Sequence, residues 1–115
     1  MIRGEIWLVD LEPARGAEAT KVRPVVLVTN DGANERAGVL GHGVVTVCPV
    51  TSNVSRVLPF QVRLDTTESG LDQPSKVQAE QVRSVDVTRL VRRIGRVAPA
   101  RMWEVDEALR FHLDL

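Results

Sequence analysis

The chain of 115 residues has one cysteine, no tyrosine and no excess charge of either sign. The single cysteine, Cys48, excludes an internal disulfide and fits a reducing compartment. Fifteen basic and fifteen acidic residues give a net charge of +0, so any affinity for nucleic acid must come from a local cluster. Aromatic residues make up only 3%, which leaves few side chains on which bases could stack.

Long apolar runs are also missing. The opening MIRGEIWLVD is interrupted by Arg3, Glu5 and Asp10, which excludes a secretory signal, and no segment approaches the length of a membrane helix. We therefore expect a cytoplasmic protein. Its length suits one domain over residues 1–115, large enough to bury a core without metal or disulfide support.

Six segments have the composition or alternation of β-strands: 5–11, 24–30, 44–50, 59–65, 76–86 and 90–97. In 59–65, for example, Phe60, Val62 and Leu64 alternate with polar residues. The glycine-rich segment 31–43 predicts a long loop or loose hairpin, 66–75 is rich in turn formers, and 87–90 predicts one helical turn.

From Pro99 onward, the apolar residues recur at helical spacing instead of alternating as in a strand. Pro99 suits a first helical position, and Met102, Val105, Leu109 and Leu113 recur at helical spacing. This predicts a C-terminal amphipathic helix of about four turns. Short strands followed by one helix predict a mainly β fold, built as a small, strongly bent sheet or barrel.

Metal and cofactor sites have no support in the sequence. His42, His112 and Cys48 share no ligand spacing, and no glycine-rich phosphate motif is present. Cys48 lies among valines, so we expect it to act as a small apolar side chain in the core. We expect neither a metal nor a cofactor.

Polar residues at the ends of the predicted strands are the remaining candidates for a functional site. Arg23 stands before Pro24 and an apolar run, and Thr51, Ser52 and Asn53 follow the strand 44–50. Each group alone is also typical of an exposed turn. The segment from Arg83 to Arg101 holds six arginines and one acid, which indicates either a solvated basic edge or a surface that attracts phosphates.

Three blocks, in order, resemble the MazF/PemK family of toxin endoribonucleases. They are RGEIWLVDLEPARGAEATKVRPVVLVTN, then PVTSN with LPFQVRL, then VQAEQVRSVD with the RL that follows, and they cover about residues 3 to 90. The resemblance implies a small SH3-like β-barrel that is usually a homodimer. It also implies cleavage of single-stranded RNA without metal, and neutralisation by a small MazE-like antitoxin.

The resemblance places the catalytic arginine at Arg23, the catalytic threonine at Thr51 and the acidic loop residue at Glu18. The expected RNA contacts are Lys21, Ser52, Asn53, Ser75, Glu80, Gln81 and Arg83. A guanidinium offers a planar set of donors to phosphate oxygens, and a hydroxyl can donate to the same group. Because arginine has a pKa above about 12, physical chemistry favours an electrostatic role for Arg23, with Glu18 or water moving the proton.

Two other functions remain open at this point. A CcdB-like toxin directed at gyrase would use the same barrel and act through its C-terminal residues. A nucleic-acid-binding barrel without catalysis would keep the arginines but would not need Thr51.

Overall fold

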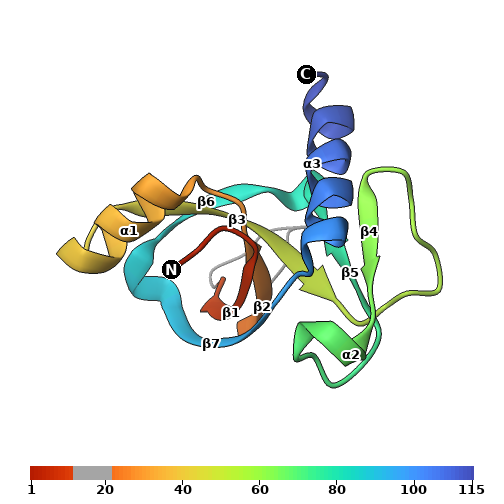
Figure 1. The fold of residues 1–115 in the computed structure, drawn as a ribbon, viewed down its shortest axis with the longest axis horizontal. Helices are drawn as coiled ribbons and strands as arrows, with labels where there is room; N and C mark the ends of the chain where they lie inside the picture. Colours follow the sequence, from red (N-terminus) through yellow and green to blue (C-terminus); the bar gives the residue numbers. More distant parts are fainter. Residues whose placement is uncertain (12–21) are drawn as a thin grey trace.

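The computed structural model describes residues 1–11 and 22–115, and these ranges form a curved antiparallel sheet with helices at its faces and ends (Figure 1). The strands are β1 (Glu5–Asp10), β2 (Val22–Leu27), β3 (Val44–Thr51), β4 (Gln61–Leu64), β5 (Ser75–Gln78), β6 (Arg83–Asp86) and β7 (Leu90–Arg96). The α-helices are α1 (Asp31–Leu40), α2 (Thr66–Ser69) and α3 (Pro99–Leu113). Two short 3₁₀ turns, Ala79–Gln81 and Val87–Arg89, complete the order.

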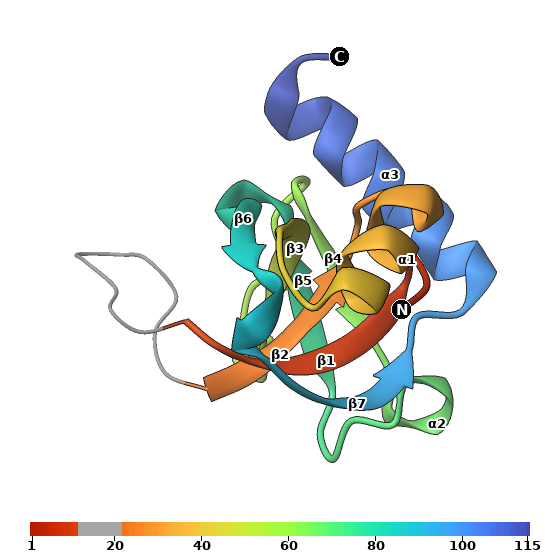
Figure 2. The same cartoon turned by 90° about the vertical axis from the view of Figure 1, so that its left-hand side faces the viewer.

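The sheet runs in the order β4-β5-β3-β2-β1-β7, and β6 pairs with β3 beside this path. Figure 2 shows how strongly β1, β2 and β7 curve beneath α3. Over the described residues the end strands β4 and β7 do not pair with each other. The mainly β fold with a C-terminal helix is therefore as predicted, while closure into a barrel stays a prediction.

The two faces of the central strands bury two apolar clusters. One lies against α3, β4 and β5 and includes Ile6, Val26 and Val105, all fully buried. The other lies beneath α1 and β6 and includes Val9 and Leu27. Burial on both faces explains why β1 to β3 are apolar nearly throughout, whereas the outer strands carry the charge.

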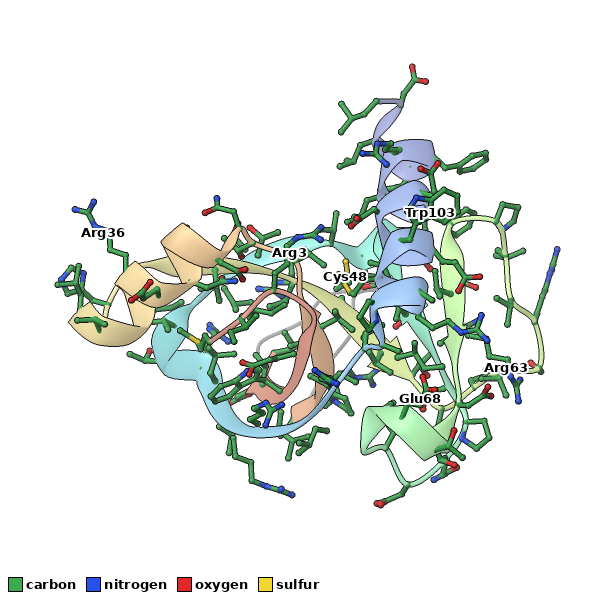
Figure 3. The ribbon with its side chains drawn as sticks, in the orientation of Figure 1. Arg3, Arg36, Cys48, Arg63, Glu68 and Trp103 are labelled. Atoms are coloured by element: carbon green, nitrogen blue, oxygen red, sulfur yellow. The ribbon has the colours of Figure 1, made fainter. Side chains whose placement is uncertain are left out.

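Cys48 lies in the first cluster, between β3 and α3 (Figure 3). It is fully buried, as predicted, and this burial raises the pKa of its thiol to about 12. The group is therefore a neutral thiol at physiological pH and acts as a core side chain.

The predicted loop 31–43 is wrong, because residues 31–40 form helix α1. The side chain of Asn30 caps the helix by accepting a hydrogen bond from the Ala33 N–H at 2.9 Å. At the other end Gly41 has φ 69°, and its N–H donates to the carbonyl of Ala37. These caps and the burial of Ala37 outweigh the helix-weakening glycines inside the segment.

The segment 76–86 was predicted as one strand, and the structure divides it into β5 and β6. Val47 pairs with Arg83 and Val50 pairs with Val77, so three steps along β3 match six steps along the facing chain. The 3₁₀ turn between β5 and β6 takes up the extra residues. The sequence alternates on both sides of this turn, so periodicity alone did not reveal it.

Helix α3 begins at Pro99 as predicted and buries Val105 and Ala108. An ion pair joins α3 to the start of the chain: Nη2 of Arg3 lies 2.7 Å from Oδ1 of Asp106, and Figure 3 labels Arg3. The predicted apolar stripe is wrong at Leu113, which is 49% exposed, since the last turn of α3 extends past the sheet (Figure 1). In the described ranges no helix combines the length and the apolar character needed to cross a membrane.

Candidate functional site

A cavity of about 580 Å³ opens where the start of β2, the end of β3, the loop after α2 and the middle of β7 meet. Its polar wall residues are Arg23, Thr51, Ser52, Asp72, Gln73, Ser75 and Arg92. The structure thus brings together four of the residues that the sequence singled out, although they come from distant parts of the chain.

Strand register explains why Arg23 and Thr51 meet. Antiparallel β2 and β3 pair Val25 with Pro49, so Arg23, two residues before Val25, and Thr51, two residues after Pro49, lie at the same end of this pairing. Arg23 is partly buried near the start of β2, where it pairs with Val9 of β1. Both side chains therefore stand on paired strands, which hold them in fixed relative positions.

The polar residues after β3 have different surroundings. Thr51 is partly buried, and its Oγ1 accepts a weak hydrogen bond from the Asn53 N–H at 3.3 Å. Ser52 is exposed and lines the cavity. Asn53 does not line it, and its Oδ1 instead accepts hydrogen bonds from the N–H and the hydroxyl of Ser55. In this chain Asn53 shapes the turn.

Ser75 begins β5 and is 5% exposed on the cavity wall. Its hydroxyl donates to the carbonyl of Gln73 at 2.9 Å. The hydroxyl proton is therefore used inside the loop, which leaves the oxygen of Ser75 as an acceptor for a donor in the cavity.

Glu80, Gln81 and Arg83 do not line this cavity. The Oε2 of Glu80 accepts a hydrogen bond from Nε2 of Gln61 at 2.7 Å, and Oε1 of Gln61 accepts one from the Leu58 N–H. Gln61 is one of the polar residues that alternate with Phe60, Val62 and Leu64, yet it is only 9% exposed, and these partners satisfy its buried amide. Arg83, in β6, pairs with Val47 of β3. Glu18 and Lys21 lie outside the described residues.

Arg92, Gln73 and Asp72 are wall residues that sequence reasoning missed. The arginine-rich segment was noted, but composition could not tell which arginine reaches the cavity. Strand register identifies it as Arg92, because Leu8 of β1 pairs with Arg92 on one side and with Pro24 on the other.

A close backbone contact builds one wall of the cavity. Gly95 of β7 lies against the C-terminal end of α2, where an added Cβ would overlap the carbonyl oxygen of Ser69. Gly70, at φ +82°, lies against the carbonyl of Ile94, which an added Cβ would also overlap. Only glycine allows both chains to approach this closely, so the two glycines fix the loop 70–75 against β7.

We predict that Gly95→Ala will force this loop away from β7 and cost about 2 kcal/mol or more in unfolding free energy. Gly32→Ala is the matched control, because the added Cβ there has ordinary contacts and alanine favours helix. Urea denaturation measures the unfolding free energy of both variants. A Gly95→Ala protein as stable as Gly32→Ala would contradict this account of the wall.

The described part of the wall combines two arginines, one aspartate, three hydroxyl side chains and one amide. Guanidinium groups backed by hydroxyl donors suit a phosphate oxygen better than an apolar ligand. The fold and the cavity thus define a small, mainly β protein with a polar cavity at its strand ends whose wall suits an anion. The chain belongs to the family described as PemK-like, MazF-like toxins of type II toxin–antitoxin systems, which it matches over residues 2–113.

Similar proteins agree with this family. The endoribonuclease MazF9 of Mycobacterium tuberculosis is 58% identical over 115 residues, which cover 100% of this chain and 98% of MazF9. The solved toxin MazF-mt6 of the same organism has a TM-score of 0.79 at 28% identity and covers 96% of this chain and 97% of its own. An endoribonuclease from a mycobacterial species, solved with its cognate antitoxin, shares the fold with a TM-score of 0.79, 23% identity and coverage of 100% and 96%.

Proposed function

We propose that this protein is a sequence-specific endoribonuclease that cleaves single-stranded RNA and acts as the toxin of its toxin–antitoxin pair. The observation that carries the proposal is the meeting of Arg23 and Thr51 in one cavity through the register of β2 and β3. The full-length similarity to a protein named endoribonuclease supports it.

The proposed reaction uses the RNA's own 2′-hydroxyl as nucleophile. Its oxygen attacks the adjacent phosphorus, the bond from phosphorus to the 5′ oxygen breaks, and a 2′,3′-cyclic phosphate forms. Arg23 donates to the non-bridging oxygens, where negative charge builds up, and the Thr51 hydroxyl donates to the same group. Glu18 or water accepts the 2′ proton, and the leaving 5′ oxygen gains a proton.

We propose that these protein groups suffice without a metal ion. Fixed guanidinium donors can stabilise the charge that a divalent cation would otherwise neutralise. The test is incubation of the pure protein with a long single-stranded RNA in excess chelator, followed by mapping of the ends. We expect fragments that end in 2′,3′-cyclic phosphate at recurring short sequences, and intact RNA would overturn the proposal.

The same experiment separates the two other functions. A gyrase-directed toxin would leave RNA intact and block supercoiling by gyrase. A binding barrel without catalysis would retard RNA on a gel and never cut it. The cavity at the strand ends favours the nuclease, since a toxin acting through its C-terminal residues would not need Arg23 beside Thr51.

We further propose that the chain is a single cytoplasmic domain that closes into an SH3-like barrel and works as a homodimer. Glu80, Gln81 and Arg83 lie outside the cavity of one chain, so they can contribute to RNA binding through a groove shared by two chains. Sedimentation at micromolar concentration tests the dimer. A fully active monomer would contradict it.

The proposed partner is a small antitoxin with an acidic or extended segment. Such a segment can lie over the arginine-rich surface and compete with RNA for the same charges, folding as it binds. Cleavage that persists at saturating antitoxin would exclude a blocked site.

A further inference from the structure

Arg92 is exposed on β7 and lines the same cavity as Arg23. Leu8 pairs with Arg92 and with Pro24, so β1 alone separates Arg92 from Pro24, the residue after Arg23. Two strand spacings set the backbones of Arg92 and Pro24 about 10 Å apart. Arg23 and Arg92 both line the cavity, and two long arginine side chains from strands this far apart can contact neighbouring groups of one extended ligand.

The charge of Arg92 is not neutralised within residues 1–11 and 22–115, where it has neither a hydrogen bond nor an ion pair. The adjacent Arg93 differs, because its Nε lies 2.9 Å from Oε2 of Glu5. Arg93 does not line the cavity. One arginine of this consecutive pair is thus bound within the fold, and the other offers its charge to the site.

The surroundings of Arg92 favour a phosphate over a base edge as its ligand. Reading a base with two parallel hydrogen bonds requires a guanidinium that other groups hold in place. In the described structure no hydrogen bond orients Arg92, so its contribution is charge more than direction. The phosphates of an RNA strand supply one negative charge per nucleotide, and each can accept this kind of charge contact.

We propose that Arg92 binds the phosphate next to the one that Arg23 holds for cleavage. The inference rests on the proposed ribonuclease function and assigns Arg92 to RNA binding, not to bond breaking. Loss of Arg92 then raises KM and leaves kcat nearly unchanged. It also lowers the dependence of binding on salt, because one fewer counterion is released from the RNA.

The test compares Arg92→Ala with Arg93→Ala, which removes the same charge from the next residue of the same strand. The RNA is a short single strand spanning a site that the wild type cuts, with a 2′-deoxy group there to prevent cleavage during titration. We expect Arg92→Ala to bind about tenfold more weakly, with the salt slope reduced by about 0.7, and Arg93→Ala to bind like wild type. Arg92→Lys, which keeps the charge, should retain most of the affinity.

A neutral methylphosphonate, placed at one phosphate at a time, identifies the contact. At one phosphate flanking the cleavage site it should weaken wild type about as much as Arg92→Ala does, and it should not weaken Arg92→Ala further. Unchanged affinity and slope for Arg92→Ala, beside a wild type that binds and cuts, would overturn this inference alone. An Arg92→Ala protein that cuts a different RNA sequence, with an unchanged dependence of binding on salt, would also overturn it. A wild type that neither binds nor cuts RNA would instead overturn the proposed function.

Discussion

Arg23→Ala is expected to slow single-turnover cleavage by about 10³-fold, because it removes the donors aimed at the phosphate where negative charge accumulates. Arg23→Lys should recover little of this rate. An ammonium carries the charge but lacks the planar fork that meets two oxygens at once. The expected loss is in the chemical step, which distinguishes Arg23 from Arg92.

The measurement uses a short RNA cut at one site, with the enzyme in excess and chelator present. Circular dichroism establishes that each variant is folded, and Arg93→Ala controls for the loss of one positive charge. A folded Arg23→Ala protein that cuts at the wild-type rate would show that the active site lies elsewhere.

Thr51→Ala is expected to slow cleavage by about 10²-fold, the usual loss for one hydrogen-bond donor to a transition state. Thr51→Ser should keep much of the rate, because the hydroxyl donates and the methyl group only packs. Serine can also accept the hydrogen bond from the Asn53 N–H that Thr51 accepts now. Thr46→Ala, in β3 but away from the cavity wall, is the matched control.

The pair Arg23 and Thr51 also makes a joint prediction. If both stabilise the same phosphate oxygens, the double variant should lose less than the product of the two single losses, since groups that act as a unit are not additive. Independent losses that multiply fully would indicate that the two residues act at separate steps. A Thr51→Ala protein with wild-type cleavage would remove Thr51 from the mechanism.

The sequence predicted most strands and α3 because their signals are local. Alternation, β-branched runs and a proline at the first helical turn reflect which face of each element is buried. The helix α1 was missed for the opposite reason. Its glycines argued against a helix, and the favourable contributions, capping by Asn30 and burial of Ala37 against the sheet, depend on tertiary geometry.

The candidate site divides in the same way. Arg23, Thr51, Ser52 and Ser75 were named from the sequence, and the structure brings them to one cavity. Asn53 was named with them, but its side chain holds a turn, because a polar residue after a strand can serve either role. Arg92 was not singled out, since consecutive arginines look alike until pairing assigns them.

By itself, the sequence determined the family, the mainly β composition, the amphipathic C-terminal helix and the residues that resemble a ribonuclease site. These depend on residue type and spacing along the chain. Only the tertiary structure decided that β2 and β3 pair in the register that brings Arg23 and Thr51 to the same end of the two strands, and that close contacts at Gly70 and Gly95 fix part of the cavity wall beside them. It also decided that Arg92, and not Arg93, reaches the cavity. Pairing between distant strands depends on the burial of both sheet faces at once, and no local stretch of sequence contains that information.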